Sequence, residues 1–184
     1  MIKKAIILCG GTGSRMYPAT KTTNKQLLPV YDKPMFYYPL SLLMLIGIKN
    51  YLFIINKGQK ENFLKSIGST NDLGINVEFK EQDKPNGLPE AFILGEKFIG
   101  KDSVLMILGD NFFYGNMLSP VIKKTLSIKN GANIYLYPSK NTSAYGVVEL
   151  KKNGKINKII EKPIFTKSNL VITGMYIFDN KVIE

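Results

Sequence analysis

The 184-residue sequence predicts an α/β protein built on a mixed, mostly parallel β-sheet flanked by helices. Short runs rich in Ile, Val, Phe and Tyr alternate with helix-like segments, and this alternation is typical of parallel sheets covered on both faces. Towards the end of the chain several strands follow one another without a helix between them, which predicts a mixed extension of the sheet. The length and the 45% of hydrophobic residues suit one domain over residues 1–184.

The predicted elements follow from hydrophobic periodicity and from local start signals. The apolar runs that predict strands are residues 5–8, 51–55, 75–80, 104–108, 133–137, 145–150, 156–161 and 171–178. Residues 34–46 are apolar almost all round, which predicts a buried helix, whereas 60–67 and 89–99 are amphipathic. A Ser followed by Pro opens a further predicted helix over 119–128.

Missing residue types exclude several kinds of chemistry. The chain has no histidine, so it contains no Ser-His-Asp or Cys-His nucleophile and no histidine metal ligand. A single cysteine, Cys9, excludes internal disulfides and cysteine-cluster zinc sites, and it fits a reducing cytoplasm. Any chemistry must come from carboxylates, lysines, hydroxyls, amides and backbone N–H groups.

The formal net charge of +11 raises the question of a polyanionic partner. The lysines are scattered and no aromatic-basic motif accompanies them, so we expect a lysine-rich composition and no nucleic-acid partner. Lysines between 151 and 158 surround an Asn-Gly pair, which predicts a solvated hairpin turn. The longest apolar stretch, 39–48, is far shorter than the ~20 residues of a membrane-spanning helix, so no membrane partner is expected.

A glycine-rich loop follows the first predicted strand, with the sequence CGGTGSR over residues 9–15. Glycines at the carboxyl end of a first strand let backbone N–H groups approach phosphates, and Arg15, the single arginine of the chain, offers a fork of donors suited to phosphate oxygens. The alternative is a purely structural tight turn. A dinucleotide fingerprint fails because Met16 replaces its third glycine, and a P-loop fails because Ser and Arg follow the last glycine.

Longer motifs carry a resemblance to a known family. Residues 8–20 read LCGGTGSRMYPAT and residues 25–34 read KQLLPVYDKP. With MFYYPLSLLMLIGI, QDKPNGLPEAFILGEKFIG, LGDNFFYG, YGVVEL, EKP and VITGMYIFDN, they make the chain similar to the sugar nucleotidyltransferases, or nucleoside-diphosphate-sugar pyrophosphorylases, over essentially its whole length. The resemblance implies the Rossmann-like nucleotide-diphospho-sugar transferase fold.

Within that family the motifs are most similar to members that join dTTP to glucose 1-phosphate, giving dTDP-glucose and pyrophosphate. The resemblance implies Mg²⁺ as cofactor, dTTP or UTP and glucose 1-phosphate as substrates, a cytoplasmic location and a homo-oligomer in the full-length proteins. A phosphate monoester has a second pKa near 6, so its attacking oxygen is already charged at pH 7 and needs no general base. A site without histidine is coherent with this reaction.

The resemblance also assigns roles to residues around the glycine-rich loop. Arg15 would neutralise the leaving pyrophosphate, and Lys25 would lie at the α-phosphate. The alternative for Lys25 is a solvated loop lysine. The residues that would cradle the triphosphate are Gly10, Gly11, Gly13 and Ser14.

Two further segments would complete the nucleotide site. Gln82 and Gly87 match the base-binding segment, and a glutamine amide complements the N3–H and carbonyls of thymine or uracil. Because that amide can flip, it excludes cytosine weakly, and the alternative for Gln82 is an exposed loop residue. Asp110 follows a predicted strand, where a carboxylate facing a phosphate loop is a natural Mg²⁺ ligand; the alternative is a cap or turn residue.

The sugar-phosphate pocket is assigned by the family match. Glu161 would bind sugar hydroxyls and Lys162 the phosphate, whereas a strand-end ion pair is their alternative. A strand aromatic is the alternative for Tyr145. The full set of expected sugar-phosphate residues is Asn111, Tyr145, Gly146, Glu161, Lys162 and Ile172.

The match departs from the family in one respect. Family members run beyond this sequence, and a later segment gives the metal a second aspartate, which nothing in residues 1–184 replaces. We therefore expect a core that lacks the C-terminal part and holds half a metal site. Two alternatives to thymidylyl transfer therefore stay open: uridylyl transfer to the same sugar phosphate, and a nucleotide-binding module without catalytic activity. A basic nucleic-acid-binding domain and a dinucleotide oxidoreductase are weaker alternatives.

Overall fold

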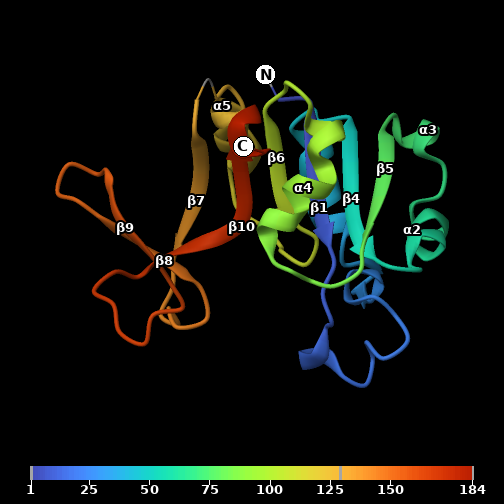
Figure 1. Cartoon of the computed structure of the whole chain (residues 1–184), viewed down its shortest axis with the longest axis horizontal. Coiled ribbons are helices and arrows are strands. Elements are labelled where there is room, and N and C mark those ends of the chain that lie inside the picture. The colour runs from blue at the N-terminus through green and yellow to red at the C-terminus, as the bar shows by residue number, and fades with distance from the viewer. Residues whose placement is uncertain (1, 129, 184) are drawn as a thin grey trace. The chain divides into compact units, whose positions relative to one another are not determined.

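In a computed structural model, which describes residues 2–128 and 130–183, the chain divides into two compact units. The first unit comprises Met1–Asn133 and Ile177–Glu184, and the second comprises Ile134–Tyr176. Figure 1 labels elements of both. The nucleotide-site residues predicted from the sequence all belong to the first unit, and most of the predicted sugar-phosphate residues belong to the second.

A parallel sheet forms the centre of the first unit (Figure 1). Its strand order is β5-β4-β1-β6, and β1 pairs in parallel with both β4 and β6. Its strands are β1 (Lys4–Cys9), β4 (Asn50–Asn56), β5 (Asn76–Gln82) and β6 (Val104–Leu108). The inner strands are buried on both faces, which explains why they appear in the sequence as continuous apolar runs rather than as alternating ones.

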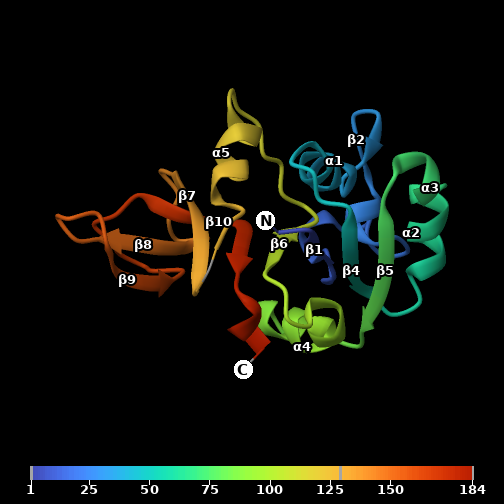
Figure 2. The same ribbon diagram turned by 90° about the horizontal axis from the view of Figure 1, so that it is seen from above.

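Helices cover both faces of this sheet. Figure 2 shows α1 on one face and α4 on the other. The α-helices of the unit are α1 (Tyr37–Leu45), α2 (Lys60–Ile67), α3 (Thr70–Leu73), α4 (Leu88–Ile99) and α5 (Leu118–Thr125). Within residues 2–128 and 130–183, no helix has the length and apolar character needed to cross a membrane.

The helix α4 packs closely on the sheet through a glycine. A methyl group on Gly95 would lie 3.1 Å from Ile6 Cδ1 and 3.2 Å from Leu52 Cδ2, so the helix backbone rests directly on β1 and β4. The opposite face carries an aromatic cluster, in which Phe53 of β4 lies 5.8 Å from Phe36 and 6.1 Å from Phe63 between ring centroids. The adjacent β4 residues Leu52 and Phe53 thus pack on opposite faces of the sheet, because successive side chains of a strand point to opposite faces.

Two predicted helices differ from the observed ones. The helix predicted over 34–46 begins only at Tyr37, because Pro29–Val30 (β2) and Lys33–Pro34 (β3) pair as a short antiparallel hairpin. The helix predicted over 119–128 is Leu118–Thr125, so the Ser-Pro pair lies inside its first turn instead of capping it. Short 3₁₀ segments complete the unit: η1 (Ser14–Met16), η2 (Lys25–Leu27) and η3 (Asn180–Ile183).

The second unit is a set of strands without a helix. Strand β8 pairs in antiparallel fashion with β9 and with β10, and β7 pairs with β10. These strands are β7 (Ala132–Pro138), β8 (Gly146–Leu150), β9 (Ile156–Glu161) and β10 (Leu170–Phe178). The predicted lysine-rich turn joins β8 to β9, with Gly154 at a φ of 77°. The prediction of a mixed, mostly parallel sheet flanked by helices is confirmed.

The packing of α4 predicts a difference between two isoleucines. Ile6 is fully buried beneath α4, whereas Ile93 is 72% exposed on that helix. Ile6→Ala should lower the free energy of unfolding by about 2–5 kcal/mol, because it leaves a cavity under the helix. Ile93→Ala should change it by less than about 0.5 kcal/mol. Urea unfolding followed by circular dichroism measures both, and equal losses would contradict the packing described here.

Candidate active site

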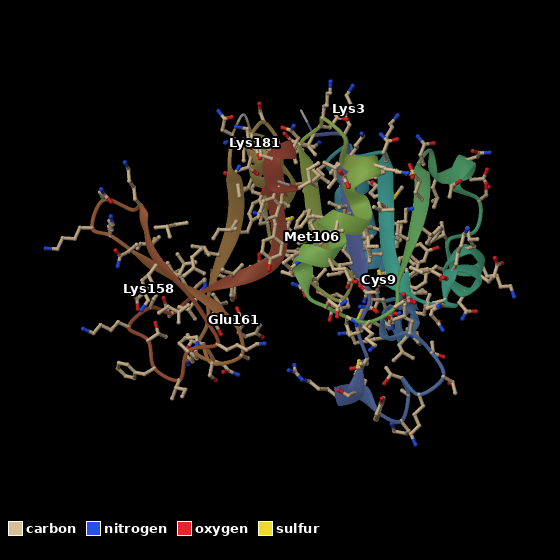
Figure 3. The ribbon with its side chains drawn as sticks, viewed as in Figure 1. Lys3, Cys9, Met106, Lys158, Glu161 and Lys181 are labelled. Carbon is tan, nitrogen blue, oxygen red and sulfur yellow. The ribbon has the colours of Figure 1, made fainter. Side chains whose placement is uncertain are left out.

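The glycine-rich loop leaves the carboxyl end of β1, where Figure 3 labels Cys9. Gly11 and Gly13 have φ values of 111° and 60°, in the left-handed region that residues with a Cβ atom rarely adopt. The backbone turns there, and Ser14 begins a single 3₁₀ turn that carries the exposed Arg15. The four predicted triphosphate residues and Arg15 thus lie in one turn at the end of the first strand.

A residue from the neighbouring strand holds this turn in place. Asn56 ends β4, and its Nδ2 donates to the Gly11 carbonyl at 2.8 Å while its Oδ1 accepts from the Gly11 N–H at 3.1 Å. The sequence analysis did not single out Asn56. The available signal is its position, a polar residue directly after an apolar strand that lies beside the loop-bearing strand.

The start of the 25–34 motif and the residue before it bind the same loop. Asn24 Nδ2 donates to the Cys9 carbonyl at 2.9 Å, and Gln26 Nε2 donates to the Gly10 carbonyl at 3.3 Å. Both side chains are almost fully buried. Gln26 Oε1 is sealed from solvent and accepts no hydrogen bond from any residue that the structure describes. These amides fix the backbone on either side of Lys25 against the glycine-rich loop.

Lys25 and Asp110 meet at this end of the sheet. Asp110 follows β6, where the Gly109 N–H donates to the Leu8 carbonyl at 2.9 Å and keeps the chain beside β1. The Lys25 ammonium forms an ion pair with the Asp110 carboxylate, and the two side chains are 25% and 29% exposed. Lys25 is therefore not a solvated loop lysine. A predicted phosphate ligand and the predicted metal ligand lie in contact.

The donor set at Asp110 suits a magnesium ion bound together with phosphates. Mg²⁺ is commonly held by one or two carboxylates plus substrate phosphate oxygens rather than by an all-protein cage. Asp110 supplies a partly exposed carboxylate beside the glycine-rich loop. No group of three or more Asp, Glu or Cys side chains that could hold a metal gathers anywhere in residues 2–128 and 130–183.

Gln82 lies in the sheet and not in a loop. The predicted strand 75–80 extends to Gln82, which is paired with Asn56 of β4 and is 5% exposed, so the alternative of an exposed loop residue is wrong. Its Nε2 lies 3.5 Å from Asn56 Oδ1. A methyl group on Gly10 would overlap the Gln82 amide, so the two residues are in direct contact. Gly87 precedes α4 with a φ of 93° and is exposed.

The predicted sugar-phosphate residues of the second unit form their own cluster. A methyl group on Gly146 would lie 3.1 Å from Glu161 Oε2 and 3.3 Å from Ile172 Cδ1. The Lys162 N–H donates to the Tyr145 carbonyl at 3.0 Å, and Lys162 Nζ lies 3.4 Å from Glu161 Oε1. Five of the six residues therefore lie together, and the sixth, which follows Asp110, belongs to the first unit.

Tyr176 is a residue near this cluster that the sequence analysis did not identify. Burial raises the pKa of Tyr176, and the negative charge of Glu161 raises it further. The Tyr176 phenol therefore stays protonated, and it interacts electrostatically with the carboxylate of Glu161, which is predicted to bind sugar hydroxyls. A tyrosine within an apolar strand gives no signal in the sequence that separates it from a core residue.

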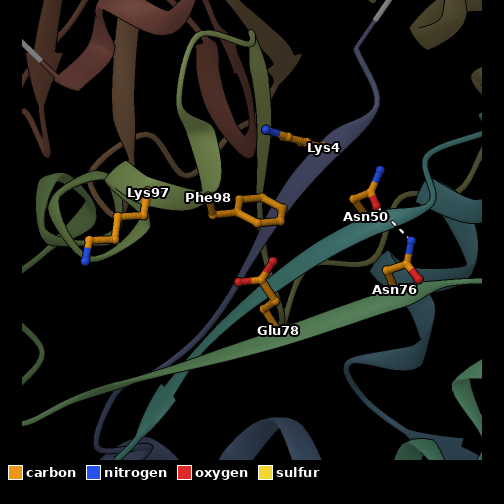
Figure 4. A pocket seen from close by; sticks show the side chains of 6 residues that line it. All are labelled: Lys4, Asn50, Asn76, Glu78, Lys97 and Phe98. Atoms are coloured by element: carbon orange, nitrogen blue, oxygen red, sulfur yellow. Dashed lines mark hydrogen bonds between the residues drawn. The ribbon is translucent and has the colours of Figure 1, made fainter.

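A separate hollow lies at the other end of the parallel strands (Figure 4). Its lining includes Lys4, Asn50 and Asn76, the first residues of β1, β4 and β5, and Asn76 Nδ2 donates to Asn50 Oδ1 at 3.0 Å. Open α/β sheets bind their ligands at the carboxyl ends of the strands. The glycine-rich loop end is therefore the candidate site.

A model of the nucleotidyl transferase family matches residues 4–184. The chain belongs to this family. It is 46% identical over 181 residues to a glucose-1-phosphate thymidylyltransferase of Neisseria meningitidis and 47% identical to one of Mycobacterium tuberculosis, covering 98% of this chain in both cases. The chain spans 63% and 62% of the length of these two relatives.

Solved structures agree with this assignment. The fold matches a structure described as a glucose-1-phosphate thymidylyltransferase of Bacillus anthracis with a TM-score of 0.90 and 38% identity, over 98% of this chain and 72% of the other. A UDP-glucose pyrophosphorylase complexed with UDP-glucose matches with a TM-score of 0.83 and 26% identity, over 100% of this chain and 78% of the other. The resemblance found in the motifs and the fold it implied are confirmed.

Cys9 is predicted to be unreactive towards thiol reagents in the folded chain. Burial and the nearby Asp110 charge raise its pKa, against a smaller lowering by Lys25. At pH 8 the thiol should react with a disulfide reagent only after denaturant unfolds the chain. Above about pH 8.5, the pKa of an unfolded thiol, unfolding releases a proton, so Cys9 makes the free energy of unfolding fall with rising pH.

The Cys9→Ala variant is the control for this prediction. The difference in free energy of unfolding between the unchanged chain and Cys9→Ala isolates the thiol from the lysines and tyrosines that titrate in the same range. The difference should stay constant below pH 8 and shift by about 1.4 kcal/mol per pH unit well above it. A constant difference up to pH 10, or rapid labelling of the folded chain, would contradict the assignment.

Proposed function

We propose that this chain is the catalytic core of an Mg²⁺-dependent glucose-1-phosphate thymidylyltransferase. The observation that carries the proposal is the contact between Lys25 and Asp110 beside the glycine-rich loop. One end of the sheet thus offers backbone N–H groups, a cation and a carboxylate, which is what a metal-bound triphosphate requires. The names of the relatives supply the substrates dTTP and glucose 1-phosphate.

The proposed reaction is an in-line displacement at the α-phosphorus of dTTP. An oxygen of the sugar phosphate forms a bond to the α-phosphorus, and the bond from that phosphorus to the bridging oxygen breaks. Pyrophosphate leaves with the electron pair, and dTDP-glucose is the other product. Because the attacking phosphate oxygen is already negative at pH 7, no side chain has to remove a proton. This matches a chain without histidine.

The chain's own residues would work by positioning and by charge neutralisation. The turn from Gly10 to Ser14 would bind the triphosphate through backbone N–H groups. Lys25 would exchange its contact with Asp110 for an α-phosphate oxygen, which neutralises charge that grows during the displacement. Arg15, exposed at the end of the turn, would bind the departing pyrophosphate with its fork of donors.

The metal and the nucleobase complete the nucleotide side. Mg²⁺ bound at Asp110 would supply electrostatic neutralisation of the phosphates. Gln82 would read the base through its amide, and Gly87 would let the backbone before α4 approach it. Thymine and uracil present the same N3–H and carbonyls, so uridylyl transfer from UTP is the alternative of the same class.

The sugar phosphate would bind to the cluster of the second unit. Glu161 would accept hydrogen bonds from sugar hydroxyls, and Lys162 would bind the phosphate in exchange for its exposed contact with Glu161. Ile172 and Gly146 would shape this part of the site, with Tyr145 as a further contact. Asn111 would be a further substrate contact in the first unit. The absence of a side chain at Gly146 leaves room for the Glu161 carboxylate.

A second candidate is nucleotide binding without turnover. It is favoured by one observation: in the part of the chain that the structure describes, Asp110 does not belong to any group of three or more Asp, Glu or Cys side chains that could hold a metal. The Lys25 ammonium is its partner instead. This candidate predicts that the chain binds dTTP and releases no pyrophosphate.

The test is pyrophosphate release from glucose 1-phosphate, Mg²⁺ and either dTTP or UTP. Arg15→Ala should lower kcat by about 10²–10³-fold, the effect of removing one donor that stabilises charge in a transition state. Lys21→Ala is the matched control, because Lys21 is another exposed cation of the same segment, and it should leave kcat unchanged. The ratio of the rates with dTTP and UTP identifies the nucleotide.

Asp110→Asn tests the proposed metal ligand. It keeps the size of the side chain and removes the charge, so it should abolish the dependence of turnover on Mg²⁺ together with most of the turnover. Release that survives in both Arg15→Ala and Asp110→Asn would overturn the proposed site. Binding of dTTP without release in the unchanged chain would favour the second candidate.

A further inference from the structure

We propose that Asn56 is a positioning residue that fixes the orientation of the Gln82 amide and thereby makes the nucleotide site select against cytosine. The inference rests on the proposed function, in which Gln82 reads the nucleobase. Asn56 itself touches the loop and Gln82, and it acts on the base through Gln82. The argument uses the contacts of four residues, Gly10, Gly11, Asn56 and Gln82, all in the first unit.

The orientation of the Asn56 amide is imposed by the backbone. Its oxygen faces the Gly11 N–H at 3.1 Å, and its nitrogen faces the Gly11 carbonyl at 2.8 Å. A backbone N–H cannot become an acceptor, and a carbonyl cannot become a donor. Rotating the Asn56 amide by 180° would therefore replace two hydrogen bonds by two repulsive contacts, so a single orientation is stable.

The fixed Asn56 amide in turn determines the orientation of the Gln82 amide. Its Oδ1 also faces Gln82 Nε2, at 3.5 Å, which is long for a hydrogen bond. Even at this distance the sign of the interaction depends on which atom of Gln82 is turned towards it. A flipped Gln82 would bring Oε1 against Asn56 Oδ1, and two acceptors would face each other without a proton between them. The nitrogen therefore stays on the Asn56 side.

The Gln82 amide has little room to rotate or to move away from Asn56. The residue is 5% exposed, and its amide lies against Gly10 in the space that a side chain would fill. Within residues 2–128 and 130–183, no hydrogen bond to Gln82 Oε1 is formed. The amide is thus held by packing on one side and by Asn56 on another, with its acceptor left for a ligand.

A fixed acceptor distinguishes the pyrimidine bases. Thymine and uracil carry a hydrogen on N3, which Gln82 Oε1 can accept, and the second Nε2 hydrogen can be donated to a neighbouring carbonyl. Cytosine has an unprotonated N3, so the same arrangement opposes two acceptors. A freely rotating glutamine would flip and donate to cytosine instead. With Asn56 in place, the Gln82 amide cannot flip to suit cytosine. The amide still binds thymine and uracil equally, because both carry a hydrogen on N3.

The experiment compares the binding of dTTP and dCTP by calorimetry in the presence of Mg²⁺. Asn56→Ala should weaken the binding of both nucleotides, because the glycine-rich loop loses two hydrogen bonds. It should also lower the preference for dTTP over dCTP by roughly tenfold, the effect of one neutral hydrogen bond on an equilibrium. The ratio of the two affinities isolates the selectivity from the shared loss at the loop.

Two further variants separate positioning from general damage. Asn56→Asp keeps an oxygen towards the Gly11 N–H and Gln82 Nε2, so it should retain the preference for dTTP. It weakens the binding of both triphosphates, because its second oxygen opposes the Gly11 carbonyl and its negative charge repels the phosphates. In a Gln82→Ala background, Asn56→Ala should leave the affinity ratio unchanged, because the residue that it orients is gone. A residue that only stabilised the fold would change the ratio equally in both backgrounds or in neither.

A second readout needs no nucleotide. In the unliganded chain, nuclear Overhauser contacts should join the Gln82 side-chain amide protons to the Gly10 α-protons, and Asn56→Ala should weaken them while Asn56→Asp keeps them. Unchanged contacts and an unchanged dTTP to dCTP ratio in Asn56→Ala would overturn the inference and leave the proposed function standing. Failure of the unchanged chain to bind dTTP would overturn the proposed function, and with it the assignment of this amide to base selection.

Discussion

The candidate site depends on how the backbone is held after it leaves the central strand. Between Cys9 and Gly11 the chain stops pairing with its neighbours, and its carbonyls lose their partners in the sheet. Amide side chains replace those partners: Asn24 binds the Cys9 carbonyl, and Gln26 and Asn56 bind the next two. Because these groups are neutral, the turn is fixed without using any cation that a phosphate requires.

The charged pair next to the turn can be understood in the same way. A carboxylate and an ammonium group that are both about one quarter exposed gain from facing each other as long as nothing else neutralises them. A triphosphate with its metal would offer each of them a partner of opposite charge. Such an exchange would leave neither charge without a partner, so Lys25 and Asp110 would not have to be desolvated anew when a ligand binds.

Most of the fold could be predicted from hydrophobic patterns because the parallel strands are buried on both faces and are therefore continuous in the sequence. The beginning of α1 could not, since residues before Tyr37 are apolar enough for a helix but pair as a hairpin. Arg15 and Asp110 carried a signal through charge and position. Asn24 and Gln26 carried none, and Asn56 carried only its position at the end of an apolar strand, because a neutral amide that binds a backbone group looks like any surface residue until the strand register is known.

Glycines serve two different needs within the same turn. Gly11 and Gly13 are required by conformation, because their φ values are positive. Gly10 has no positive φ, and its requirement is space: any side chain would strike the Gln82 amide. The missing side chain at Gly10 leaves space for the Gln82 amide, whose nitrogen also faces Asn56 Oδ1. Shared contacts therefore join the turn that would hold the triphosphate to the amide that would read the base. A substitution that displaces one of them should also displace the other.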